Sequence, residues 1–331
     1  MGTHTRAAQN IVCNNSAETI RVIKEACMNY TAHPYQSRND LYQIGKLIRR
    51  AYARQKRFNA WSFCRYDIWA LRRIADAGSF NDHSWQEYFQ LMQDENGLLV
   101  GAAFAFDNHH WRKNPEPYAL IVDPDHAQLA KVLFDWAESS GMCEIEVLQG
   151  NTFLCDLAQL RGYTRSNDFM ILREKILMDT PHETVSLPQG YSIRTLNQSE
   201  WNCYFEAVHA VFNRMDTPQA FASIQRAPSN VHELHLNVVN DQNQIAAFCS
   251  VWLDRENNLA EFEPVGTVPQ FQKQGLAAAL IAYACNRLRE MNCSQVNVAS
   301  WSESIGANKL YSACGLVEYD RLYDWKKGSS T

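Results

Sequence analysis

Long apolar segments and an excess of basic residues are both missing from this 331-residue sequence. The longest apolar runs, GLLVGAAFAF and LAAALIAYAC, have about half of the ~20 residues that a membrane-spanning helix needs, and the start, MGTHTRAAQN, lacks the apolar region of a signal peptide. We therefore expect a cytoplasmic protein that does not bind membranes. A formal charge of −5 offers no basic surface for phosphate backbones, so we do not expect a nucleic-acid partner.

Metal-binding and common nucleotide-binding motifs are also absent. The ten cysteines stand singly, without a CxxC pair or a Cys/His spacing typical of zinc, so we expect them reduced and mostly buried, with no bound metal. His109 and His110 are neighbours and would point apart on an extended chain, which favours a loop. The patterns GxGxxG, GxxxxGK[ST] and GxSxG do not occur, so the sequence does not support a dinucleotide, P-loop or serine-hydrolase site.

What the sequence does contain is one layout of elements used twice. Two hairpins are predicted around DENG and DQNQ, and at an offset of 147 they align Asp94 with Asp241 and Leu98 with Ile245. After each hairpin comes a strand that ends near a proline, then an amphipathic helix and another strand. Self-similarity at such a long period indicates a duplicated domain.

The proline-containing segment MDTPHETVSLPQG separates the two halves and is typical of a linker. We expect an N-terminal extension at 1–28, with a short helix around AETIRVIKEACM, a first domain at 29–178, a linker at 179–188 and a second domain at 189–331. Single helices alternate with strands in both halves. The predicted fold class is therefore α+β (mixed α/β), with two tandem domains, each a mixed, partly parallel sheet flanked by helices.

The segment VPQFQKQGLAAAL carries the most informative pattern of the second half. A predicted strand, AEFEPVGTV, runs into a loop with the single glycine Gly275 and then into an alanine-rich helix. Such a helix start presents unpaired N–H groups, backed by the helix dipole, to an anion. A helix start that merely contains a glycine is the alternative. The matching segment of the first half has no glycine and carries Asp123, Asp125 and His126. The acidic charge of the two aspartates would repel phosphate.

The spacing Gln272-x-x-Gly275-x-Ala277 resembles the pyrophosphate loop of the GNAT superfamily of acyl-CoA-dependent N-acyltransferases. The segment SIGANKLYSACGL resembles that superfamily's closing helix, with Ser304 where Asn is usual and Leu316 where Phe is usual. The motifs cover 189–331, and the first half joins the resemblance only through the repeat, as a degenerate GNAT-like domain. The resemblance implies acetyl-CoA as co-substrate, held by Val265, Gly266, Thr267, Gln272, Lys273, Gln274, Gly275, Leu276, Ala277 and Ser304.

The resemblance also implies catalytic roles. Glu261 and Glu263 alternate on the strand, so both can face one acceptor, and such residues often act as base in the superfamily; two solvent-facing carboxylates are the alternative. Tyr311 is the candidate acid for the leaving thiolate, or else a packed aromatic residue. A backbone N–H near 265–267 would stabilise the oxyanion, since Pro264 is compatible with a disturbed ladder, although a plain edge-strand proline explains it almost as well.

The implied activity is N-acetylation of a primary amine of a small molecule or peptide, bound between the halves. Glu261, Glu263 and, with them, Asp254 or Glu256 would give the site an acidic lining, which favours a cationic amine such as a polyamine, an aminoglycoside-like compound, an amino-acid derivative or a peptide N-terminus. The aromatic residues from Trp61 to Trp69 are expected in the core, with one face able to cover an acceptor. Two other hypotheses remain open: another acyl donor, and a CoA-binding regulatory protein without turnover. Monomer and homodimer are equally compatible with the sequence.

Overall fold

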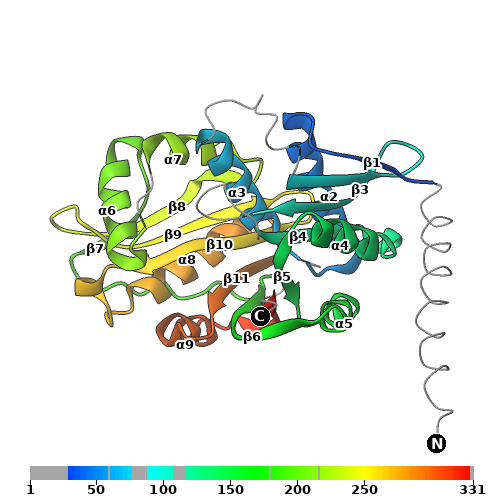
Figure 1. The fold of residues 1–331 in the computed structure, drawn as a ribbon. Coiled ribbons are helices and arrows are strands. Elements are labelled where there is room, and N and C mark those ends of the chain that lie inside the picture. Colours follow the sequence, from blue (N-terminus) through cyan, green and yellow to red (C-terminus); the bar gives the residue numbers. More distant parts are fainter. Residues whose placement is uncertain are drawn as a thin grey trace, which may run out of the picture. The chain divides into compact units, whose positions relative to one another are not determined.

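The computed structural model of the chain describes residues 29–58, 60–76, 86, 88–106, 116–178, 180–214 and 217–328 (Figure 1). Three expectations fall outside the described residues. They are the N-terminal helix, the end of the helix after residue 60 at Gly78, and the loop at His109 and His110. In the part of the chain that is described, no helix is long and apolar enough to cross a membrane.

The two halves repeat one order of elements, which confirms both predicted hairpins and the strand–helix–strand units after them. The first series is β1 (Thr31–His33), α2 (Arg38–Gln55), α3 (Phe63–Asp76), β2 (Phe89–Gln93), β3 (Leu99–Ala105), β4 (Glu116–Val122), η2 (Pro124–His126), α4 (Leu129–Ser139), β5 (Met142–Leu148), α5 (Thr152–Leu160) and β6 (Tyr163–Ile176). The second series is β7 (Tyr191–Thr195), η3 (Gln198–Glu200), α6 (Trp201–Phe212), α7 (Pro218–Ile224), β8 (Asn230–Asn240), β9 (Ile245–Asp254), β10 (Leu259–Thr267), η4 (Pro269–Phe271), α8 (Leu276–Glu290), β11 (Gln295–Trp301), α9 (Ile305–Ala313) and β12 (Val317–Lys327).

The chain forms two compact units, and both draw on separated stretches of sequence. Unit 1 comprises the described parts of Met1–Leu47 and His83–Ile145, and unit 2 those of Ile48–Asp82 and Glu146–Thr331. In unit 1 the strands β1 to β4 pair antiparallel in chain order, and β4 then pairs parallel with β5. The helix α4 packs on β3 and β4. The predicted domain boundaries remain a prediction.

The sheet of unit 2 runs β12-β6-β11-β10-β9-β8-β7. Strand β6 belongs to the first series, yet it pairs antiparallel with β11 on one side and with β12 on the other. Strands β10 and β11 are parallel, whereas β7, β8, β9 and β10 pair antiparallel. The second series therefore completes its sheet with a strand that the first series supplies.

The core of unit 2 lies on both faces of this sheet. The apolar stripe of α8, which recurs every four residues, is buried against β8, β9 and β10 (Figure 1). On the opposite face, α6 and α7 cover Phe248 and Val239. Helix α3 packs against α7, and the Ser223 hydroxyl of α7 donates to the Leu71 carbonyl of α3 at 2.9 Å. The face opposite α8 is thus covered partly by α3 and the residues beside it, which we call the α3 segment (residues 60–76).

A buried ion pair holds the α3 segment in unit 2. Arg49 Nη2 lies 2.7 Å from Asp67 Oδ2, and the Ser229 hydroxyl donates to the same oxygen at 2.6 Å. Asp254, which we expected, as an alternative to Glu256, to line the acceptor site, is only 2% exposed and lies 3.9 Å from Arg49 Nε. Arg49 pairs with its charge within this structural network, and a contact between Asp254 and an acceptor stays a prediction.

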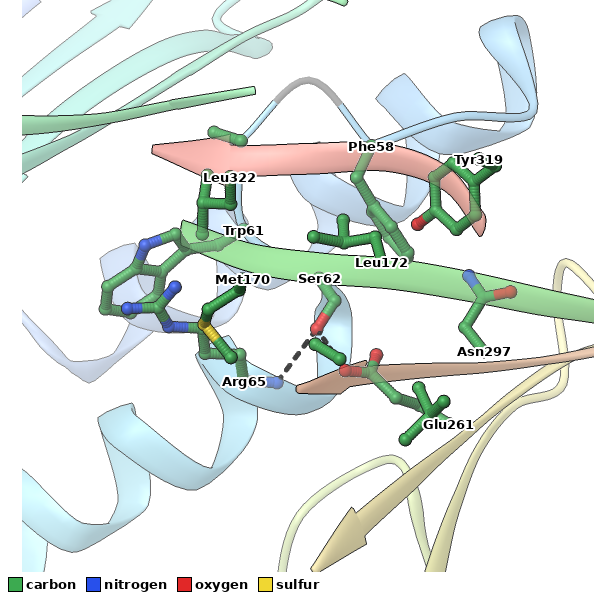
Figure 2. Close-up of a pocket in the computed structure, with 13 residues that line it drawn as sticks. Phe58, Trp61, Ser62, Arg65, Met170, Leu172, Glu261, Asn297, Tyr319 and Leu322 are labelled. Carbon is green, nitrogen blue, oxygen red and sulfur yellow. Dashed lines mark hydrogen bonds between the residues drawn. The ribbon is translucent and has the colours of Figure 1, made fainter. Parts of the chain in front are cut away.

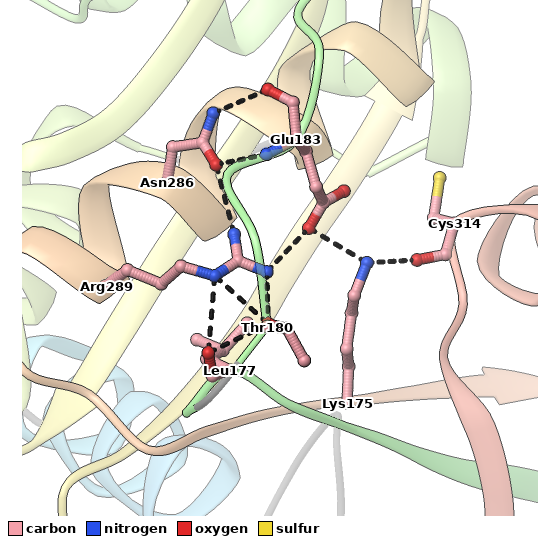
Figure 3. A network of polar contacts seen from close by, with 7 residues as sticks. All are labelled: Lys175, Leu177, Thr180, Glu183, Asn286, Arg289 and Cys314. Carbon is pink, nitrogen blue, oxygen red and sulfur yellow. Dashed lines mark hydrogen bonds and ion pairs between the residues drawn. The ribbon is translucent and has the colours of Figure 1, made fainter.

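The segment after β6 is fixed against α8, although a linker was expected there (Figure 3). Glu183 is its anchor: its carboxylate lies 2.9 Å from Lys175 Nζ and 3.2 Å from Arg289 Nη2. The Glu183 backbone N–H donates to Asn286 Oδ1 at 2.8 Å, and Arg289 Nη2 donates to Thr180 Oγ1 at 2.8 Å. Thr180 and Glu183 are therefore held against α8 within unit 2.

Candidate active site

The glycine loop leaves the N-terminus of α8 open. Gly275 has a φ of 79°, in the left-handed region that favours glycine, and immediately precedes the helix. No described side chain caps this end of α8, so its first N–H groups keep their hydrogen-bonding capacity. A Cβ built at Gly275 would meet nothing within 4 Å among the described residues. The loop therefore presents bare backbone to its surroundings.

The side chains of the loop take different positions. Gln272, Lys273 and Gln274 are exposed beside Gly275. Gln272 Nε2 donates to the Thr267 carbonyl at 3.2 Å, which folds the loop back on the end of β10. Leu276 is 1% exposed in the apolar core, so only its main chain can contact a cofactor, while Ala277 is half-buried in the first turn.

Strand β10 separates from β11 just before this loop. The parallel pairing covers only Leu259 to Glu261 against Gln295 to Asn297, and the register with β9 shifts between Phe262 and Val265. After that shift the Val268 N–H donates to β9, at the Ala246 carbonyl. Because N–H directions alternate along a strand, the Val265 and Thr267 N–H groups point to the other side, into the gap that β11 has left. They are positioned as candidate oxyanion donors.

Gly266 has a structural reason that the sequence did not reveal. A Cβ at this position would lie 2.4 Å from the Phe248 ring, which packs directly on the strand. A side chain of the protein's own core therefore requires glycine at this position.

Glu261 lies buried at the point where β10 and β11 part (Figure 2). It is 8% exposed, and its Oε1 accepts a hydrogen bond from the Ser62 hydroxyl at 2.9 Å. Its Oε2 is buried and has no hydrogen-bond partner in the described part of the chain. Burial raises the pKa of Glu261 to about 8, and the negative charge of Glu263 adds to the rise. A carboxyl with such a pKa can take up and release a proton near neutral pH.

A pocket opens above Glu261, within unit 2 (Figure 2). It holds about 420 Å³ of space, its open mouth included. Its aromatic and apolar lining consists of Phe58, Ala60, Trp61, Met170, Leu172, Val298, Ala299, Tyr319 and Leu322, and its polar lining of Ser62, Arg65, Glu261 and Asn297. The segment 58–65 that covers it belongs to the first series of elements.

Glu146 and Arg65, beside this pocket, form an ion pair. Glu146 accepts from the Trp61 indole at 2.7 Å and from Arg65 Nη2 at 2.6 Å, and the Arg65 guanidinium lies 4.3 Å from the Trp61 ring centroid. Sequence reasoning did not identify Ser62, Arg65 or Glu146, because no local pattern links them to Glu261. It did note the aromatic residues around Trp61, which are buried as expected.

Glu263 occupies the irregular part of β10. It is half-buried, and its main-chain carbonyl accepts a hydrogen bond from the Trp252 indole at 2.5 Å. Pro264, which follows, has no N–H to give to the ladder. The irregularity at these two residues is what separates the paired part of β10 from the part that faces the gap.

Tyr311 approaches the same strand from α9. It is 5% exposed and belongs to the core cluster that contains Phe262 and Leu280. Burial raises the pKa of Tyr311 well above its usual range, and the charge of Glu263 adds to the rise, so the phenol keeps its proton. Since Phe262 shares the face of Tyr311, Glu261 must project from the opposite face. The candidate acid and base therefore lie on opposite faces of β10.

Helix α9 is held by Asn308 and not by the side chain of Ser304. Ser304 begins the helix, but its hydroxyl makes no capping hydrogen bond with any residue that the structure describes. Asn308 Oδ1 accepts from Arg173 Nη1 at 2.9 Å and from the Ser300 hydroxyl at 2.8 Å. Its Nδ2 donates to the carbonyls of Trp301 and Ser302. These contacts join α9 to β6 and β11 and so position Tyr311.

The corresponding turn in unit 1 is built differently. Asp123 is fully buried, and its side chain accepts from the Asp125 N–H at 3.2 Å. His126 Nδ1 lies 2.8 Å from the Tyr30 hydroxyl, and Gln128 donates to that hydroxyl at 2.8 Å. No described side chain caps the start of α4 either, so the two turns differ in the acidic residues that this one carries and in the glycine that it lacks. As for metals, the described ranges hold no group of three or more His, Cys, Asp or Glu side chains arranged around a common point.

Comparison with known proteins identifies the second half. Residues 193–316 match the family model described as "Acetyltransferase (GNAT) family". These residues form a GNAT acetyltransferase domain. The match contains the gap beside β10, the glycine loop and Tyr311. No curated protein matches the chain.

Solved structures extend the likeness of fold to both halves. A GCN5-related N-acetyltransferase from Sphaerobacter thermophilus is similar with a TM-score of 0.60 at 18% identity, over 90% of this chain and 95% of that one. A tandem GNAT protein from the clavulanic acid biosynthesis pathway gives a TM-score of 0.60 at 15% identity, over 91% and 100%. A GNAT-family acetyltransferase from Colwellia psychrerythraea gives 0.57 at 12% identity, over 90% and 99%. The predicted tandem GNAT-like fold is confirmed.

Proposed function

We propose that the protein is an acetyl-CoA-dependent N-acetyltransferase in which the GNAT domain acetylates a primary amine by direct attack. The observation that carries the proposal is Glu261. Its buried carboxyl has a free oxygen at the point where β10 leaves β11, on the strand that leads into the open start of α8. An acyl donor and an amine could meet at this point.

The donor site fits the chemistry of CoA. A diphosphate needs unpaired N–H groups, and the uncapped start of α8 behind Gly275 offers them together with the positive end of the helix dipole. Residues Gln272 to Ala277 and the end of β10 would hold the donor, with the N–H of Val265 directed at the thioester oxygen. Ser304 would line the donor site from α9. Bound there, the donor supplies an activated acetyl group.

Each catalytic group then has a defined task. The Glu261 carboxylate takes one proton from the ammonium, assisted by the nearby charge of Glu263, and the free amine attacks the thioester carbon. The N–H of Val265 stabilises the negative oxygen. As the C–N bond forms and the C–S bond breaks, the Tyr311 phenol gives its proton to the thiolate, and the second proton lost by nitrogen restores the phenol. The products are an amide and a thiol.

The first half has a supporting role in this proposal. It contributes β6 to the sheet of unit 2, and Phe58 and residues 60–65 to the pocket, whereas its own turn carries Asp123 and Asp125 and has no glycine. A cytoplasmic location and a monomeric or dimeric state remain predictions. The acceptor is a small molecule or the amino terminus of a peptide.

Two measurements test the proposal. Calorimetry should show that acetyl-CoA binds, and release of free CoA should depend on an added amine, with a longer acyl-CoA as a comparison donor. Burial raises the pKa of Glu261 to about 8, so the base form becomes commoner as the pH rises. We therefore expect kcat/KM to rise about tenfold per pH unit below that value and then to level off. Absence of acetyl-CoA binding would overturn the donor assignment.

A further inference from the structure

The pocket above Glu261 contains two unused hydrogen-bonding groups of opposite kind. Glu261 Oε2 can only accept a hydrogen bond when ionised, and Asn297 Nδ2 can only donate one, yet both atoms are buried without a partner in the described part of the chain. The two residues are 8% and 4% exposed. An unpaired buried polar group is unfavourable, so a ligand that pairs both groups gains affinity.

The orientation of the Asn297 amide follows from its neighbours. Gln295 Nε2 donates to Glu174 Oε2 at 3.0 Å, and since a carboxylate only accepts, this atom of Gln295 must be the amide nitrogen. The same nitrogen donates to Asn297 Oδ1 at 2.8 Å. The oxygen of Asn297 is therefore occupied, and its NH₂ group is the one left for a ligand (Figure 2).

Glu261 and Asn297 are also direct neighbours. They are register partners across the parallel pair of β10 and β11, and strands in a sheet lie about 4.8 Å apart. A ligand that spans both side chains needs a hydrogen-bond donor and an acceptor within a few bonds of each other. An α-amino amide has this arrangement, with its ammonium two bonds from the carbonyl carbon.

The rest of the pocket is mostly apolar, and its described lining residues include no second carboxylate. Aromatic and aliphatic side chains, Phe58, Trp61, Leu172 and Tyr319 among them, form most of its wall. Arg65 is the cation in the lining and is paired with Glu146. One carboxylate can neutralise one ammonium, so a polyamine or an aminoglycoside would bring charges that nothing in the lining compensates.

We infer that the acceptor is an α-amino amide with an aromatic or large apolar side chain, whose ammonium binds Glu261 and whose carbonyl accepts from Asn297. This deepens the proposed function and rests on it for the identity of the site. The same chemistry occurs in a free amino-acid amide and at the amino terminus of a peptide, and a suitable pair of probes separates these two sources.

The test is binding, measured by calorimetry with and without saturating CoA, which carries no acyl group and cannot turn over. The probes are L-phenylalaninamide, 2-phenylethylamine without the carbonyl, glycinamide without the ring, spermidine, and the tripeptide Phe-Ala-Ala. We expect phenylalaninamide to bind about tenfold more tightly than phenylethylamine or glycinamide, and spermidine to bind most weakly. A tripeptide affinity equal to that of phenylalaninamide would point to peptides, and a much weaker one to free derivatives.

Matched variants locate the binding groups. Glu261→Gln and Asn297→Leu should each weaken phenylalaninamide binding about tenfold, and Asn297→Leu should remove its advantage over phenylethylamine. Asn237→Leu is the control, because Asn237 is 2% exposed, also has a buried amide atom without a described partner, and lies on β8 outside the pocket lining. Equal affinity for spermidine and phenylalaninamide, or no binding of phenylalaninamide at millimolar concentration, would overturn the inference. Either result leaves acetyl-CoA binding, and with it the proposed function, to be judged separately.

Discussion

Replacement of Glu261 by glutamine should stabilise the folded protein near neutral pH while it removes the proposed base. In the folded chain the Glu261 carboxyl is buried, with one oxygen bonded to Ser62 and the other without a described partner. Burial raises its pKa from 4.5 to about 8. Glutamine has nearly the same shape, can accept the same hydrogen bond from Ser62 and never ionises.

The size and sign of the effect follow from proton linkage. Between pH 4.5 and 8 the unfolded chain has lost this proton while the folded chain keeps it, so the contribution of Glu261 to stability is present below pH 4.5 and is lost as the pH rises through this window. Each pH unit corresponds to about 1.4 kcal/mol, so the loss at neutral pH amounts to roughly 3 kcal/mol. The glutamine variant does not suffer this loss.

Urea unfolding of both proteins across this pH window is the assay. The free energy of unfolding of Glu261→Gln minus that of the wild type should grow by about 1.4 kcal/mol per pH unit and level off near pH 8. Ser62→Ala is the companion variant: the hydrogen bond from Ser62 lowers the pKa of Glu261, so its removal should move the upper end of the window to higher pH. A difference that does not change with pH would show that Glu261 is ionised in the folded state and would refute the reasoning.

Three further predictions concern the donor site, the acid and the shared sheet. Gly275→Ala should weaken acetyl-CoA binding at least tenfold. Gly162→Ala is the control, because Gly162 also has a positive φ, 81°, and nothing within 4 Å of its Cβ among the described residues. Both variants should lose ~1 kcal/mol of stability, but Gly162→Ala should bind acetyl-CoA as the wild type does. Equal losses of acetyl-CoA binding in the two variants would show that the effect comes from a general change of the fold. Tyr311→Phe should lower kcat about 100-fold with little change in the KM for the amine, and unchanged turnover would remove Tyr311 from its role. Residues 189–331 expressed alone lack β6, so we expect circular dichroism to show no cooperative unfolding; a sharp transition would contradict the shared sheet.

Local patterns in the sequence were sufficient to predict the glycine loop and the repeated hairpins. Gly275 lies within three residues of Gln272, and a left-handed residue before a helix is a local property of the chain. Glu261 was proposed together with Glu263 because residues that alternate along a strand share a face. Short-range rules of this kind depend on backbone geometry that neighbouring residues determine.

The pocket could not be predicted in the same way. Ser62 and Glu261 are 199 residues apart in the chain, and the hydrogen bond between them depends on how the α3 segment packs in unit 2. The placement of β6 between β11 and β12 likewise depends on long-range pairing. The hydrophobic pattern of a strand does not say which other strands it pairs with. The ion pair of Asp254 with Arg49 is equally non-local, because the two residues come from distant parts of the chain.

The central claim is that the GNAT domain transfers an acetyl group from acetyl-CoA to an amine at Glu261. Mass spectrometry of phenylalaninamide after incubation with acetyl-CoA and the full-length protein tests this most directly, with Glu261→Gln in parallel. The account predicts an acetylated amide, matched by an equal amount of free CoA, and a rate at least ~100-fold lower in the variant. Tight binding of acetyl-CoA without acetylation of this or any other amine, or equal rates for the two proteins, would contradict it.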